Sequence, residues 1–291
     1  MGKRKRSQQE AVPESEEEQD TLPRLPLSRP SDQYNKNKGK WINQQRVLVL
    51  CSRGMGARER HLMEDLKSLM PHTRAETKHD TKSDLKALNE VAEIRNCNKV
   101  LYFESRKHMD LFMWVSDIAR GPSVKFHIIC MHTMDELKLS GNCLKGSRPL
   151  LKFSPDFDAP HWMLIKELLV QTFGTPHHHP KSQPFFDHVF TFTLLDNKIW
   201  FRNYQILEED GELSEIGPRF VMNPVKILDN SFSGMTLWEN PKFKTPSSVR
   251  SFNKMLKADK AVTTNKQRGA KAARQDDNPY KRSKLLETIY D

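Results

Sequence analysis

The segment that most constrains the fold is the apolar run RVLVLCS at residues 46–52, which leads directly into an amphipathic pattern. A short run rich in valine and leucine is typical of a buried β-strand. A Ser-Arg-Gly turn at 52–54 closes it. Apolar residues then recur at helical spacing over 57–70, and Pro71 ends the pattern. The sequence therefore predicts a strand–turn–helix unit.

Strands and helices continue to alternate after this unit. In the first half the patterns predict a helix over 83–95, a strand over 98–105, a helix over 109–116 and a strand over 124–130. In the second half they predict a strand over 149–153, a buried helix over 161–173, a hairpin over 188–207 and a strand over 219–228. Pro224 indicates that the last strand lies at a sheet edge or contains a bulge. The fold class is α/β, with helices covering a sheet.

Composition and charge divide the chain. The parts are a disordered charged tail (1–45), a basic first half (46–145), an acidic second half (146–240) and a basic extension (241–291). The formal charge of +10 is uneven, because residues 46–152 carry +6, residues 153–241 carry −6 and residues 242–291 carry +8. A polyanion such as RNA is attracted to the first half and the extension.

Two sequence signals bear on location. Lys3, Arg4, Lys5 and Arg6 form a cluster typical of a nuclear import signal, although a solvated charge run is equally compatible with it. No apolar run approaches the roughly 20 residues that a membrane helix requires, so we expect no membrane partner.

Two basic loops are candidate phosphate contacts. The turn after the first strand places Arg53, Arg58 and Arg60 at the start of a helix, where backbone N–H groups favour anions. It lacks the third glycine of a dinucleotide-binding loop. The second loop groups Lys145, Arg148 and Lys152 at the junction of the halves. An ordinary turn and a solvated linker are the alternatives for these two loops.

The chain offers no convincing catalytic or metal site. Three consecutive histidines at 177–179 point in different directions, and no thiol or carboxylate stands at zinc-like spacing from them. The carboxylates at 156, 158 and 208–210 have proline or glycine neighbours typical of surface turns. We therefore expect no metal, no cofactor and no catalytic residue.

Five collinear blocks resemble the Brix-domain family. They are RVLVLCSRGMGARERHLMEDLKSLMPH, GPSVKF, GNCLKGSRPLLKF, PKSQPFFDHVFTFTLLDNKIWFRNYQI and EIGPRFVM, and together they cover about 46–240. The resemblance implies two similar α/β halves, each resembling the anticodon-binding domain of class IIa aminoacyl-tRNA synthetases. It also implies a nucleolar, non-enzymatic factor that binds precursor ribosomal RNA, joins proteins of the pre-60S particle and pairs with a second assembly factor.

The family motifs also suggest site residues. By motif match, Ser52, Arg53 and Gly54 in the first loop, and Lys145 and Arg148 at the junction, become RNA contacts. Arg219, in the GPRF motif, is a further candidate, and stabilising a bend is an equally plausible role for it.

These observations lead to one hypothesis for the whole chain. The basic first half and the extension bind RNA, with both basic loops touching the same nucleic acid, while the acidic second half docks a basic partner protein through its hairpin or edge strand. An RNA-processing or RNA-modifying enzyme and a pure protein scaffold are the alternatives.

Overall fold

The predicted strand–turn–helix unit is present in the computed structural model. The structure describes residues 45–76, 78–79, 85–119, 121–207 and 211–277. Strand β1 (Val47–Cys51) is buried along its whole length, and helix α1 (Ala57–Leu69) follows it. Because α1 buries a stripe of leucines against the sheet, the local prediction from the amphipathic pattern is confirmed.

The other elements extend this unit into two halves. Those of the first half are β2 (Thr73–Ala75), α2 (Ala87–Ile94), β3 (Lys99–Arg106), β4 (Asp110–Asp117), β5 (Ser123–His132) and α3 (Met134–Leu137). Those of the second half are β6 (Arg148–Phe153), α4 (Pro160–Phe173), β7 (Phe186–Leu195), β8 (Lys198–Ile206), β9 (Leu213–Glu215), β10 (Arg219–Leu228) and β11 (Thr236–Glu239). Helix α5 (Pro246–Asp277) ends the described chain.

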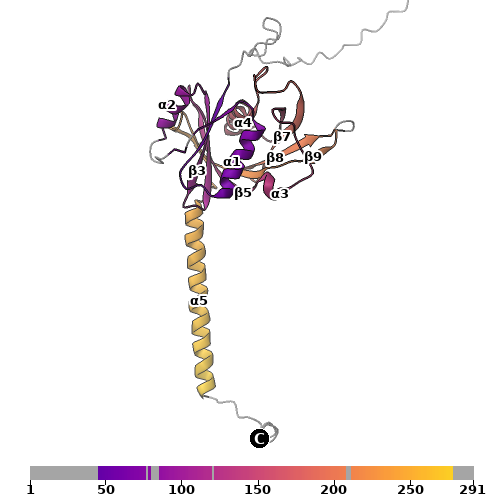
Figure 1. Cartoon of the computed structure of the whole chain (residues 1–291). Helices are drawn as coiled ribbons and strands as arrows, with labels where there is room; N and C mark the ends of the chain where they lie inside the picture. The colour runs from indigo at the N-terminus through magenta and orange to yellow at the C-terminus, as the bar shows by residue number, and fades with distance from the viewer. Residues whose placement is uncertain (1–44, 77, 80–84, 120, 208–210, 278–291) are drawn as a thin grey trace, which may run out of the picture.

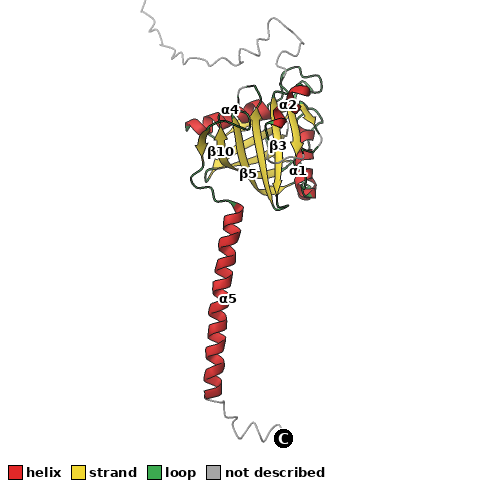
Figure 2. Cartoon of the chain, turned by 90° about the vertical axis from the view of Figure 1, so that its left-hand side faces the viewer, coloured by secondary structure: helices red, strands yellow, loops and turns green. Residues whose placement is uncertain are grey.

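The strands of the described residues form one curled sheet in which the halves repeat the same order (Figures 1 and 2). The order is β2-β1-β3-β4-β5-β10-β8-β7-β6, with β11 beside β10 and β9 beside β8. The two halves meet at the antiparallel pair β5–β10. Outward from β5 come the antiparallel strand β4 and then the parallel pair β3–β1. Outward from β10 come the antiparallel strand β8 and then the parallel pair β7–β6. The α/β class with two similar halves is confirmed, and the likeness to anticodon-binding domains stays a prediction.

Helices cover both faces of the sheet. Helices α1 and α4 share one hydrophobic core that joins the halves, because Leu66 from α1 and Phe173 from α4 belong to the same cluster as Phe126 and Phe201 from the strands. On the opposite face α2 packs its buried side over a smaller cluster that includes Trp114. One shared core makes the two halves a single packing unit.

Two buried histidines contact segments distant in sequence, His72 across the two halves and His188 within the second half. The Nε2 atom of His72, just after α1, is 2.9 Å from the backbone oxygen of Thr172 in α4, and His188 Nδ1 is 3.0 Å from Ser147 Oγ. Burial lowers the pKa of each histidine from 6.5 to about 4. Both rings are therefore neutral at neutral pH.

The helix predicted over 109–116 is wrong, because this segment is strand β4. Its alternate residues Leu111, Met113 and Val115 lie in the core under α1 and α4, while Trp114 lies in the cluster under α2. A strand buried on both faces has no polar alternation, so its apolar residues also satisfy helical spacing.

Strand β10 is central rather than at an edge, which corrects one of the two interpretations of Pro224. β10 pairs with β5 along its length. On its other side β10 pairs with β8 from Phe220 to Met222 and with β11 from Lys226 onward. Pro224 lies in this gap, next to a register shift. The bulge interpretation is confirmed, since a residue without an N–H is tolerated where the ladder is interrupted.

The β7–β8 hairpin follows the sequence prediction closely. Asp196 and Asn197 form its two-residue turn, and both have positive φ, 53° and 57°. This is the backbone that tight hairpin turns require and that Asn and Asp tolerate best.

The structure bears on the membrane prediction but not on the nuclear import prediction. The predicted import cluster Lys3–Arg6 and nearly all of the tail lie outside the described residues. Among the described helices, none combines the length and apolar character needed to cross a bilayer.

Acidification should destabilise the fold through the buried histidines. Between pH 7 and pH 5 the unfolded histidine, with a pKa of 6.5, binds a proton that the folded one, at about 4, does not bind. The free energy of unfolding should therefore fall by about 2 kcal/mol for each of His72 and His188. In chemical denaturation at both pH values, His72→Gln should lack its share of this loss, and His178→Gln, at an exposed site, should keep the full loss. Equal pH dependence in the two variants would contradict the assignment.

Candidate nucleic-acid interface

The loop after β1 contacts the β3–β4 turn. Ser52 is fully buried, and its hydroxyl accepts a hydrogen bond from the Ser105 N–H at 2.9 Å, while Arg53 and Gly54 are exposed. Gly54 has φ +79°, and a Cβ there would lie 2.9 Å from His108 in the turn. Ser52 and Gly54 therefore position the loop, and Arg53 is the member of the predicted trio that a ligand can reach.

The predicted anion cradle at the start of α1 is already occupied by the chain itself. Gly56 N–H donates to the carboxylate of Glu59 at 2.9 Å, so a buried acid caps this helix end. Arg58 turns toward α3, where it pairs with Glu136 at 2.7 Å and donates to the Met131 carbonyl. Arg58 is therefore structural in this conformation, which departs from the prediction.

Arg60 remains available next to this loop. It lines a shallow groove of about 710 Å³ together with Arg53 and Lys78, and Glu64 and Glu76 are the carboxylates of the same groove. All three cations are exposed. The groove keeps a positive excess where the sequence predicted phosphate contacts.

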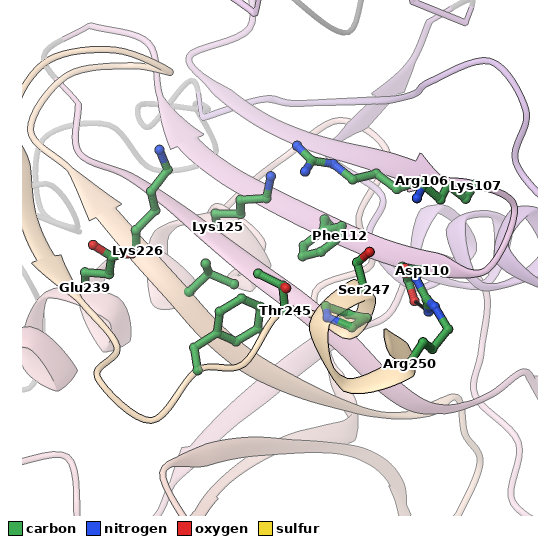
Figure 3. Close-up of a pocket in the computed structure, with 13 residues that line it drawn as sticks. Arg106, Lys107, Asp110, Phe112, Lys125, Lys226, Glu239, Thr245, Ser247 and Arg250 are labelled. Carbon is green, nitrogen blue, oxygen red and sulfur yellow. Dashed lines mark hydrogen bonds and ion pairs between the residues drawn. The ribbon is translucent and has the colours of Figure 1, made fainter. Parts of the chain in front are cut away.

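A second cavity, which we call the α5-root pocket, lies where α5 leaves the sheet (Figure 3). It measures about 420 Å³ and is lined from β3, β4, β5, β10, β11 and the first turn of α5. Its basic lining residues are Arg106, Lys107, Lys125, Lys226 and Arg250, and its acidic ones are Asp110 and Glu239. Because Lys107 belongs to the β3–β4 turn that contacts Gly54 through His108, the pocket and the groove lie at the same end of the sheet.

A buried ionic cluster builds the wall of this pocket. Glu104 accepts hydrogen bonds from Lys125 at 3.0 Å, Arg106 at 2.6 Å and Trp114 at 3.1 Å. Burial alone would raise the pKa of Glu104, but Lys125 and these hydrogen bonds bring it below its usual value. Burial lowers the pKa of Lys125 more than Glu104 restores it. The Lys125 ammonium also lies 4.6 Å from the centre of the Phe112 ring.

An ion pair fixes the start of α5 against the sheet. Arg250 donates two hydrogen bonds to Asp110, at 2.7 and 2.6 Å, in the bidentate geometry that guanidinium and carboxylate favour. These bonds hold the pKa of Asp110 below its usual value. Beyond this contact the helix projects away from the sheet (Figures 1 and 2).

Helix α5 has two different faces. At 3.6 residues per turn, one side carries Arg250, Lys254, Lys257, Lys260, Arg268 and Lys271. In the first half of the helix the opposite side carries Val249, Phe252, Met255, Leu256 and Val262, whose exposed fractions lie between 42% and 65%. Further along, Lys266 and Arg274 fall on this same side. The sequence predicted only a basic extension, and the structure adds the helix itself, its length and its apolar side.

The junction residues lie elsewhere. Lys145 and Lys152 are exposed, but Arg148 is 9% exposed, with its guanidinium 4.9 Å from the centre of the Phe186 ring. All three lie in or just before β6, the last strand of the sheet. Arg148 is therefore largely enclosed instead of presented to a ligand.

The structure does not bring the two predicted basic loops together. Arg148 and His179 line one small cavity, and His179 lines another with Arg46, which precedes β1. Arg53 follows the opposite end of β1. The junction therefore lies near the start of β1, and the first loop lies at the end of β1. The expectation that both loops present one surface is wrong.

Arg219 is engaged in the connection between β9 and β10. It donates to Glu215 at 2.6 Å, and Arg202 donates to the same carboxylate at 3.4 Å. This contact favours the bend-stabilising alternative.

The described residues contain no group of three His, Cys, Asp or Glu side chains able to hold a metal ion.

Sequence reasoning missed most of the α5-root pocket. Lys107, Lys125, Lys226, Phe243 and Arg250 are spread over more than a hundred residues, and only the sheet pairing brings them together. The basic bias of the first half and of the extension was the one signal available, and it identifies regions rather than residues.

The chain is similar to a known protein family and to proteins named as ribosome biogenesis proteins. The Brix domain family matches residues 52–226, more than half of the chain. A "Ribosome biogenesis protein BRX1 homolog" from Drosophila melanogaster is 50% identical over 291 residues, covering 93% of this chain and 81% of the fly protein. The Homo sapiens protein of the same name is 60% identical over 214 residues, which cover 73% of this chain but only 61% of the human one.

One solved structure is also similar. It is described as a crystal structure of a probable ribosomal biogenesis protein from Aeropyrum pernix K1, with 18% identity and a TM-score of 0.45. The match covers 62% of this chain and 96% of that one.

Removing the α5 anchor should loosen the first turns of the helix. Arg250→Ala deletes both hydrogen bonds to Asp110, so backbone amides of residues 247–254 should exchange with deuterium faster, while the amides of β3 to β5 keep their protection. Hydrogen–deuterium exchange with mass spectrometry measures both regions. Lys254→Ala, one turn further along, is the matched control. Equal exchange in the two variants would show that Arg250 does not anchor α5.

Proposed function

Since the chain belongs to the Brix domain family, we propose that it is a non-enzymatic assembly factor that binds precursor ribosomal RNA during biogenesis of the large ribosomal subunit. Its relatives named as ribosome biogenesis proteins support a role in that process. The proposed location is the nucleolus, with entry to the nucleus through the basic cluster at residues 3–6.

The observation that carries RNA binding is the clustering of cations at one end of the molecule. The groove with Arg53 and Arg60, the α5-root pocket and the basic face of α5 all lie there. Phosphate neutralisation with counterion release supplies most of the affinity for nucleic acids. A broad positive surface of this kind suits structured RNA, which proteins recognise through its phosphates, 2′-hydroxyls and shape.

The proposed contacts differ in rank. Arg53 and Arg60 are direct contacts, and Ser52 and Gly54 hold their loop in place. Arg58 and Arg219 are bound to the chain's own carboxylates, so their role in RNA binding is indirect. Lys145 and Lys152 are exposed and the enclosed Arg148 lies between them in sequence. These three residues form a second basic patch at β6, apart from the groove.

The second half offers a surface for a protein partner. β6 is the last strand of the sheet, and Leu144, Leu150, Phe185 and Phe186 around it are 40% to 60% exposed. An open strand edge beside exposed apolar side chains accepts an additional strand from another chain. Because β6 itself carries Arg148 and Lys152, we expect an extended apolar segment of a second assembly factor at this edge. The −6 of residues 153–241 should attract basic parts of the same factor to the rest of the second half, and the two proteins form a heterodimer in pre-60S particles.

Charge reversal in the groove should weaken RNA binding in a salt-dependent way. Arg60→Glu should lower the slope of log K against log salt concentration by about one. A glutamate in the first turn of α1 is compatible with the helix dipole, so the variant should fold. Fluorescence anisotropy with a precursor ribosomal RNA fragment measures the slope.

Lys198→Glu is the matched control, because it makes the same charge change in the second half. Equal slopes in both variants would remove the groove from the interface. Absence of RNA binding by the wild-type chain would favour the pure scaffold, and turnover of the RNA would favour a processing enzyme.

A photo-crosslinker should identify the partner surface. With benzoylphenylalanine at Phe185, the chain should crosslink to one protein in purified pre-ribosomal particles, because the exposed Phe185 side chain belongs to the apolar patch next to the edge strand β6. The same group at Met163, 54% exposed on α4, should not. Crosslinks to RNA at Phe185, or equal protein crosslinks at both positions, would contradict the docking proposal.

A further inference from the structure

We propose that the α5-root pocket binds a single unstacked nucleotide of an RNA strand, with its phosphate at Lys226 and its base against the apolar side of the pocket. This inference rests on the proposed RNA-binding function and adds to it a site for one base. Such a site would fix where a single-stranded segment begins to follow α5.

The pocket has a size suited to one nucleotide. Its volume of about 420 Å³ lies within the usual range of small-ligand sites. The labelled side chains in Figure 3 come from the sheet, from the β3–β4 turn and from the start of α5. Lys226 and Glu239 lie on one side of the hollow, and Lys107, Asp110 and Arg250 lie on the other. A helix of duplex RNA does not fit a hollow of this volume, whereas a base turned out of a strand does.

Its cations are divided between structural and available groups. Arg250 is held by Asp110, and Lys125 and Arg106 are held by Glu104. Among the residues that the structure describes, Lys107 and Lys226 form no ion pair with a carboxylate. Lys226 follows Val225 of the apolar wall, so it is the side chain placed to meet the phosphate of a nucleotide in the pocket, whereas Lys107 lies on the opposite side.

The other side of the pocket is apolar and aromatic. Val225, Phe243 and Pro246 line it, and Phe112 lies beneath the Lys125 ammonium. Phe243 is only half-buried, so one ring remains accessible for a base. Unstacked bases in protein–RNA complexes stack on aromatic rings. Phosphate alone makes no favourable contact with apolar and aromatic side chains, so this side of the pocket suits a base.

The pocket continues onto the basic face of α5. Arg250 lines the pocket, and Lys254 and Lys257 follow it at four and seven residues, on the same side of the helix. The adjoining phosphates of a strand held in the pocket are thus directed along this row of cations. Charge and aromatic contact then act on neighbouring nucleotides.

Mononucleotide binding tests the pocket directly. Ligand-observed NMR titrations of the full chain would use uridine 5′-monophosphate, uridine and inorganic phosphate, followed by the other nucleoside 5′-monophosphates. The monophosphate should bind more tightly than uridine or phosphate. Phe243→Ala and Lys226→Gln should each weaken it by about fivefold or more, and Lys244→Gln, beside the pocket but outside its lining, should leave it unchanged.

The same variants are then tested with a single-stranded RNA of about twelve nucleotides by anisotropy. Weaker binding by both pocket variants, with wild-type melting temperatures, supports the proposal. If Phe243→Ala alone lowers the melting temperature, Lys226→Gln decides. Equal affinity for phosphate and for the monophosphate, or wild-type RNA binding by both variants, overturns the nucleotide site while leaving RNA binding intact. A wild-type chain that binds no RNA fails the proposed function itself.

Discussion

The antiparallel pairing of β5 with β10 is the constraint on which the rest of the molecule depends. It joins two sets of strands with the same order into one sheet, and this sheet lets α1 and α4 share a single core. Without the central pairing each half would expose an apolar edge and half of its core. The basic end, the open edge at β6 and the origin of α5 all have their positions because this sheet is continuous.

The buried Glu104–Lys125 pair serves position more than stability. Burying two charges costs about as much as their attraction returns, so such a pair is weak support for a fold. Here the carboxylate also accepts hydrogen bonds from Arg106 and Trp114, which gives three side chains one arrangement. A polar network with every member bonded specifies a unique geometry, and a binding site needs its walls held in one geometry.

Local patterns predicted the elements that have one distinctive spacing. The β1–α1 unit and the β7–β8 hairpin were predictable because a short apolar run, amphipathic spacing and turn residues occur in order. β4 was not, since its apolar residues satisfy helical spacing as well as strand spacing. The site was less accessible still: the alternative roles of Arg58 and Arg148, bound to α3 and stacked on Phe186, depend on tertiary contacts. Lys125 and Lys226 are neighbours only because β5 pairs with β10, and no single segment encodes their proximity.

The anchored helix α5 has a mechanical consequence. Its 32 residues span about 48 Å, and Arg250 gives it a set direction at its origin. A component bound at the far end of the helix is therefore kept at a defined distance from the sheet. Over residues 249–262 the helix has cations on one side and apolar residues on the other, so this part can contact two chemically different neighbours at once.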